Sequence, residues 1–117
     1  MIDVEAMTMY MTAACMLIDF ITFIGLGAKY AWGAGEARPV GILLIVVGFF
    51  HFLVGAAFTF LCGDGYTGFL VWVFSFTFTY AGICIGWELE EKALGNALFA
   101  LGTIILVYPI DYALTGH

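Results

Sequence analysis

Four long apolar stretches, each long enough to cross a lipid bilayer as a helix, make up most of this 117-residue sequence. A hydrocarbon core about 30 Å thick needs about 20 helical residues, and the stretches cover residues 7–28, 40–61, 68–87 and 93–112. Only 10% of the residues are charged, whereas a soluble domain has about 25%. We therefore expect an all-α integral membrane protein, with about four transmembrane helices bundled into a single domain over residues 1–117.

The distribution of basic residues predicts how these helices are oriented. Lys29 and Arg38 lie between the first and second stretches, and Lys92 lies between the third and fourth. Because cytoplasmic loops carry an excess of Lys and Arg, we expect these loops inside and both termini outside, in a cytoplasmic (inner) or plasma membrane. No Arg/Lys-rich region precedes the first stretch, so we interpret it as a retained helix rather than a signal peptide.

One segment carries a different periodicity. Residues 71–80, VWVFSFTFTY, alternate apolar and hydroxyl side chains as a half-buried strand does, a pattern also found in outer-membrane barrels. The sequence then stays apolar through Trp87 without a turn, and the other three stretches lack this alternation. A helix is therefore the better interpretation.

Glycines recur with a spacing of seven in two of the stretches. Gly41, Gly48 and Gly55 lie near one stripe of the second, and Gly95 and Gly102 repeat the spacing in the fourth. Small residues allow neighbouring membrane helices to approach closely. We interpret both stripes as packing seams of a left-handed bundle.

Two ionisable side chains fall well inside the apolar stretches, Asp19 in the first and His51 in the second. Such groups are costly in lipid and usually face protein or a water path. His51 lies three residues after Gly48 and four before Gly55, so we expect it to face protein. For both residues two roles stay open: a hydrogen bond that fixes the bundle, or a part in a permeation path or pH response.

Two residues near the end of the fourth stretch have predicted roles. Asp111 is expected to reach the outer interface, and Pro109 to end or kink the helix.

The remaining candidate ligands indicate neither a metal site nor an enzyme. Cys15, Cys62 and Cys84 form no C-x-x-C pair and are interpreted as buried thiols. The alternating methionines of residues 7–11 would point to different sides of a helix. No H-E-x-x-H, G-x-S-x-G or Walker pattern occurs, and the net charge of −6 argues against nucleic acid as a partner. We expect no catalytic residue, no metal and no cofactor.

Aromatic side chains are dense in the third stretch, where Trp72, Phe76 and Tyr80 step by four and share a face with Thr79 beside them. Such a face is suited to a small, planar, neutral solute, because the rings supply contact area and the hydroxyls replace lost water. An ion would not recover the cost of its dehydration there. The alternative is ordinary aromatic packing between helices or against lipid.

Short motifs occur along most of the chain in one order. They are Tyr10, Leu26-Gly27, Pro39, Val47-Gly48, F-T-F-T-Y at 76–80, G-I at 82–83, W-E at 87–88 and L-F-A at 98–100. In residues and spacing they resemble the AmiS/UreI family of urea and short-chain amide channels. The resemblance implies a passive channel for a small neutral solute such as urea or a short amide, with both termini outside.

Two features depart from that family. Its members usually have six helices, whereas this sequence has four stretches, and Asp19 is displaced by about one position from the family's polar Asn in the first helix. We therefore expect the chain to act in the lipid bilayer as a homo-oligomer or within a larger membrane complex. The alternative function is a non-catalytic accessory subunit of a larger membrane enzyme or energy-conversion complex.

Overall fold

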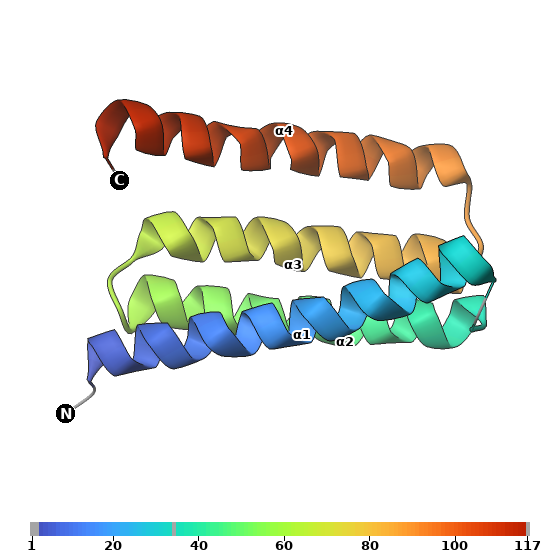
Figure 1. The fold of residues 1–117 in the computed structure, drawn as a ribbon, viewed down its shortest axis with the longest axis horizontal. Coiled ribbons are helices and arrows are strands. Elements are labelled where there is room, and N and C mark those ends of the chain that lie inside the picture. The colour runs from blue at the N-terminus through green and yellow to red at the C-terminus, as the bar shows by residue number, and fades with distance from the viewer. Residues whose placement is uncertain (1–2, 34, 117) are drawn as a thin grey trace.

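The computed structural model describes residues 3–33 and 35–116 as four long α-helices joined by short connections (Figure 1). They are α1 (Val4–Trp32), α2 (Ala37–Phe60), α3 (Gly65–Gly86) and α4 (Glu91–Thr115). Each is long and apolar enough to cross a membrane, and the described residues contain no strand. The predicted all-α membrane architecture is thus confirmed, including a helix rather than a strand at residues 71–80.

The helices run up and down in an open row in which α4 packs on α3, α3 on α2, and α2 on α1 (Figure 1). No Cα atoms of the described helices α1 and α4 lie within 8 Å of one another, so the row does not close into a four-helix bundle. Most side chains of α1 and all those of α4 are at least partly exposed, in contrast to the central pair. The core therefore lies between α2 and α3.

Each helix begins before its predicted apolar stretch, and α1 and α4 also end after theirs, whereas α2 and α3 end one residue earlier than predicted. Capping groups, rather than hydropathy, determine several of these ends. Asp3 and Asp64 each accept a hydrogen bond from the backbone N–H three residues later, at 3.1 and 3.0 Å. Gly33 ends α1 with a φ of 68°, a conformation that favours glycine. Pro109 does not end α4, which continues to Thr115. Neighbouring backbone groups of a membrane helix can adjust to the hydrogen bond that a proline removes.

The predicted glycine seam of α2 is confirmed. A Cβ atom added to Gly41 would overlap the backbone of Gly82 and Gly86, and one added to Gly48 or Gly55 would overlap side chains of α3. The two helices thus approach as closely as their backbones allow. Such contact lets dispersion forces and polar contacts hold helices together in lipid, where the hydrophobic effect offers little.

The second predicted seam, on α4, is wrong for contacts within this chain. A Cβ added to Gly95 or Gly102 would meet no atom within 4 Å. The side chains of α4 that face α3 include instead Ala97, Leu101 and Ile104. A spacing of seven identifies a stripe of a helix, but the larger side chains on other faces decide which stripe meets the neighbour.

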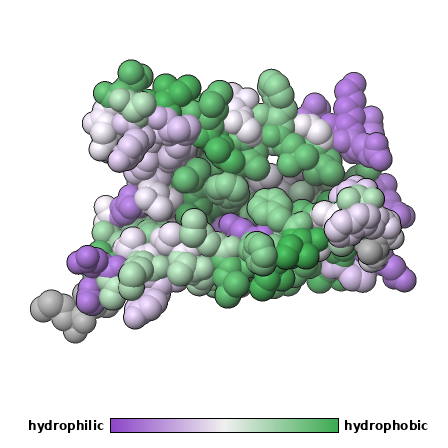
Figure 2. Space-filling view, in the orientation of Figure 1, coloured by the Kyte–Doolittle hydropathy of each residue, from purple (hydrophilic) through white to green (hydrophobic). Residues whose placement is uncertain are grey.

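The basic residues of the described helices and connections all lie at one end of the row. Lys29, Arg38 and Lys92 all lie at the end that holds the α1–α2 and α3–α4 connections, and α1 begins and α4 ends at the other (Figure 1). Figure 2 shows apolar residues over the middle of one face and hydrophilic residues gathered toward both ends. The direction of insertion stays a prediction.

Arg38 donates a hydrogen bond to the Gly86 carbonyl at 2.8 Å and lies over the Trp87 ring.

Candidate functional site

Three of the four residues predicted to contact a solute line one groove. Phe76, Thr79 and Tyr80 line the open space between α3 and α4, which has a volume of about 600 Å³. The Thr79 hydroxyl itself lies against Gly48 of α2. The other lining residues are Phe69, Val73, Thr77 and Ile83 of α3 and Ala97, Ala100, Leu101 and Ile104 of α4. None of these residues is acidic or basic. The groove is therefore an apolar, aromatic surface with a few hydroxyl groups.

Trp72 does not belong to this groove. Its indole N–H donates a hydrogen bond to the Phe52 carbonyl at 3.0 Å, and its ring stacks on the Phe52 ring. A Cβ on Gly55 would overlap the indole, so Trp72 packs into the α2–α3 seam. Each step of four residues rotates a position by about 40° around a helix. Trp72 is therefore about 80° from Tyr80, far enough to face a different helix.

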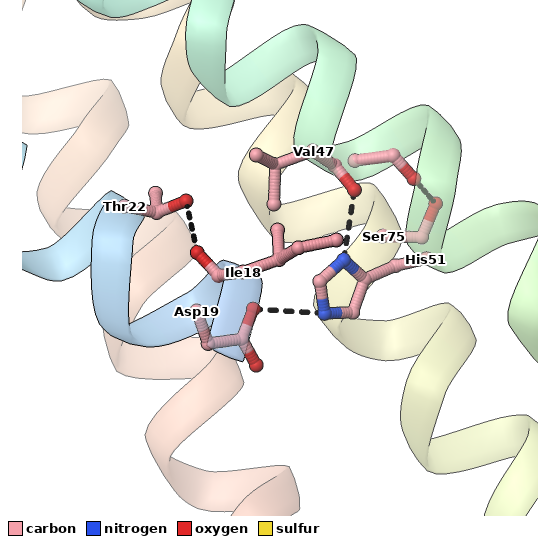
Figure 3. Close-up of polar contacts among 7 residues, drawn as sticks. Ile18, Asp19, Thr22, Val47, His51 and Ser75 are labelled. Carbon is pink, nitrogen blue, oxygen red and sulfur yellow. Dashed lines mark hydrogen bonds and ion pairs between the residues drawn. The ribbon is translucent and has the colours of Figure 1, made fainter. Parts of the chain in front are cut away.

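Asp19 and His51 meet each other across the α1–α2 interface (Figure 3). The His51 Nε2 atom lies 2.9 Å from Asp19 Oδ1, and His51 Nδ1 lies 2.8 Å from the Val47 carbonyl oxygen. The His51 side chain is buried, as expected, and the Asp19 side chain is 26% exposed. The contact therefore connects α1 to the tightly packed pair of α2 and α3 near the middle of both helices.

Aromatic rings and one hydroxyl surround the imidazole. The Phe78 and Phe74 rings of α3 lie 5.2 and 6.5 Å from the His51 ring, between centroids. The buried Ser75 hydroxyl donates a hydrogen bond to the Gly48 carbonyl at 2.6 Å. This second polar contact crosses the seam one helical turn from His51, so polar groups and close packing occur together here.

A cavity of about 270 Å³ opens between α1, α2 and α3 beside the Asp19–His51 pair. Its lining residues are Thr12, Cys15, Met16 and Asp19 of α1, His51 and Phe58 of α2, and Thr67, Leu70, Val71 and Phe74 of α3. None of these residues lines the α3–α4 groove. The intramembrane polar residues and the aromatic face thus form two separate sites.

A third group of contacts, which the sequence analysis missed, holds α4 onto α3. The Tyr66 hydroxyl donates a hydrogen bond to Asp111 Oδ2 at 2.9 Å, and the Tyr108 hydroxyl donates one to the Tyr66 carbonyl at 3.2 Å. The Tyr66 and Tyr108 rings lie 4.7 Å apart. Asp111 thus has a partner within the chain, whereas the sequence suggested only that it reaches the interface. The sequence signal was weak: Tyr108 and Asp111 are three residues apart at a helix end.

The potential metal ligands are dispersed. Cys15, Cys62 and Cys84 are free thiols, and no group of three His, Cys, Asp or Glu residues in the described ranges is placed to hold a metal ion. The chemistry that the described residues support is hydrogen bonding at Asp19 and His51, and contact with a neutral molecule in the groove. Comparison with protein-family models, with curated proteins and with solved structures finds no match to this chain.

Proposed function

We propose that this protein lets a small neutral solute, such as urea or a short amide, pass through the membrane, and that the α3–α4 groove forms part of the path. The observation that carries the proposal is the composition of the groove. Aromatic rings and hydroxyl groups line it, and no acidic or basic side chain does. An ion entering it would lose its hydration without an opposite charge in exchange.

The hydroxyl groups of the groove match the donors and acceptors of an amide. The Thr77 hydroxyl donates to the Val73 carbonyl at 2.9 Å, so its oxygen is left to accept a hydrogen bond from a solute N–H. Tyr80 also lines the groove and brings a hydroxyl that both donates and accepts. The Phe76 ring, which is 71% exposed, offers a flat face for a planar solute.

The groove is open on one side, and a path through a membrane needs a complete wall. A second copy of the chain or another subunit would supply that wall in this proposal. Aromatic side chains on the exposed surfaces of α3 and α4, among them Phe76 and Phe99, are available for such a contact. The proposed active form is therefore an oligomer or a larger assembly.

The direct test measures urea and acetamide flux in proteoliposomes. Phe76→Ala and Tyr80→Ala remove contact area from the groove and are expected to alter the flux severalfold while the protein stays folded. Phe49→Ala is the matched control, because this equally large ring is exposed on α2, away from the groove and from the proposed contact surface of α3 and α4. Phe74→Ala, in the packed interior of the helices, is expected to lower stability more than flux.

Wild-type flux no greater than that of empty liposomes, from folded and fully assembled protein, would refute the channel proposal. A second candidate would then account for the same surface: a non-catalytic accessory subunit whose aromatic faces pack against larger membrane subunits. The extensive exposure of α1 and α4 favours it. Native mass measurement separates the two candidates, since the channel would be a homo-oligomer and the accessory subunit would co-purify with larger chains.

A further inference from the structure

The hydrogen bonding of His51 determines which of its ring nitrogens carries a proton. Nδ1 lies 2.8 Å from the Val47 carbonyl oxygen, which can only accept a hydrogen bond. Nδ1 must therefore donate, because two lone pairs facing each other at this distance in a buried site would repel. A neutral ring with its proton on Nδ1 has a bare lone pair on Nε2.

That requirement leaves a proton between His51 and Asp19. Nε2 faces Asp19 Oδ1 at 2.9 Å, and neither atom has another hydrogen-bond partner among the described residues. A bare Nε2 facing an ionised carboxylate would place two acceptors in contact and leave an uncompensated anion in the apolar interior. One additional proton removes both penalties, whether it resides on the carboxyl group or on the imidazole.

We infer that Asp19 and His51 together form a proton-binding site in the middle of the membrane, which holds one proton between Oδ1 and Nε2 and has no net charge. In one form a neutral carboxyl group donates to Nε2, and in the other an imidazolium donates to the carboxylate. Movement of the proton between the two atoms changes the charge of each partner but not that of the pair. This site is separate from the proposed solute groove, and its test does not depend on solute flux.

The cavity beside the pair gives the proton a route to one end of the protein. Thr12 lies seven residues before Asp19 on α1, about 10 Å toward the beginning of that helix. Thr67 lies near the beginning of α3 and Phe58 near the end of α2, so all three line the part of the cavity toward the end where α1 begins. The hydroxyl groups of Thr12 and Thr67 are the hydrogen-bonding groups along this route.

The opposite side of the pair is closed by the core. Leu44, Val47 and Phe78 are almost completely buried there, and Thr22 is buried with its hydroxyl bonded to the Ile18 carbonyl at 2.8 Å. The site is thus expected to exchange protons with the compartment that the termini face and not with the other.

Few other titratable groups face the pair. Among the described residues that line the cavity, α1 contributes Cys15 besides Asp19, and α2 contributes only His51. The residues of α3 that line it are Thr67, Leu70, Val71 and Phe74, none of which is charged. No nearby Lys or Arg lines this cavity to compensate an ionised Asp19, which supports a proton as the bound cation.

Nitrogen-15 NMR of the full chain in lipid bilayers tests the protonation state directly. The sequence has two histidines, so His117→Gln leaves His51 as the only imidazole signal. At neutral pH we expect a proton on Nδ1 and a second, shared proton at Nε2. In Asp19→Asn the shared proton should be lost and the ring should become the neutral Nδ1–H form. Ser75→Ala, which removes a buried hydroxyl near the ring without touching the pair, should leave the spectrum of the pair unchanged.

Two results would overturn the assignment. A proton on Nε2 with a bare Nδ1 would mean that His51 simply donates to an ionised carboxylate. An unprotonated Nε2 beside an ionised Asp19, identified by its carboxylate carbon-13 shift, would mean that the pair holds no proton. Circular dichroism of the same sample distinguishes either state from misfolding.

Access is tested with a small, charged, thiol-specific methanethiosulfonate reagent in oriented proteoliposomes. Cys62→Ser with Cys84→Ser leaves only Cys15, which lines the cavity. Labelling is expected from the side of the termini and not from the other. A matched variant that retains only Cys62, in the turn between α2 and α3, reports that the reagent reached that side. Labelling of Cys15 from the opposite side alone would refute the proposed route.

Discussion

Replacing Gly48 by leucine is expected to disrupt the packing between α2 and α3. A Cβ at this position would already lie 2.9 Å from the Ser75 carbonyl oxygen and the Thr79 backbone nitrogen. Leucine adds three more carbon atoms at a place where the Thr79 side chain and the backbone of α3 both already block a Cβ. The helices must separate, and the hydrogen bond from Ser75 to the Gly48 carbonyl is then lost.

The expected loss of stability is the sum of two effects, the overpacking at Gly48 and the loss of the Ser75 hydrogen bond. Overpacking a well-packed site costs about 1–3 kcal/mol, and an interhelical hydrogen bond in a membrane contributes about 0.6 kcal/mol on average. Together they predict a decrease of about 2–4 kcal/mol in the free energy of unfolding. Unfolding in mixed micelles by titration with a denaturing detergent, followed by circular dichroism, measures this quantity.

Val46→Leu is the control for Gly48→Leu. Val46 lies two residues away on α2 and is 59% exposed, so an apolar exchange there is expected to change stability by less than about 0.5 kcal/mol. Equal losses in the two variants would show that the seam does not hold the helices together, whatever the size of the loss.

Two further predictions address α4 and the direction of insertion. Tyr66→Phe removes the hydroxyl that donates to Asp111, and α4 should become more accessible to proteolysis in detergent, with a stability loss of about 0.5–1.5 kcal/mol; unchanged cleavage would refute a role for this contact in docking α4. A reporter enzyme fused after His117 should be active only outside the cytoplasm, whereas cytoplasmic activity would reverse the orientation predicted from Lys29, Arg38 and Lys92.

The four helices could be predicted from the sequence because a membrane-spanning helix depends on the hydropathy of its own residues. Hydropathy over about 20 residues identifies a spanning helix whatever its neighbours are, and the glycine spacing of α2 placed His51 on the protein-facing side. The direction of Trp72 was not predictable in this way. Its face depends on whether α2 or α4 offers room for an indole, and Gly55 of α2 provides that room.

The association of whole helices was the part that the sequence did not reveal. Gly95 and Gly102 form a stripe as regular as that of α2, yet it meets no helix of the described chain. The α4 helix is held instead through Tyr66 and Asp111, which are 45 residues apart in the sequence. Likewise Asp19 and His51 were each recognisable as costly in lipid, but their pairing depends on how α1 crosses α2.

That crossing suggests what holds α1 in place, because α1 buries little apolar surface and lipid gives little hydrophobic drive for helix association. The Asp19–His51 contact is then one connection between α1 and the α2–α3 pair, beside the packing of the Phe23 ring on the Phe78 ring. Asp19→Leu leaves the buried His51 side chain without its partner, which is expected to lower the free energy of unfolding by about 1–3 kcal/mol. His51→Phe leaves Asp19 without its partner in the same way. The double variant is expected to lose less than the sum of the single losses, since it leaves neither group unpaired. Detergent-titration stabilities of the four proteins measure this coupling. Strictly additive losses would mean that the two side chains stabilise the fold independently and that the docking of α1 has another cause.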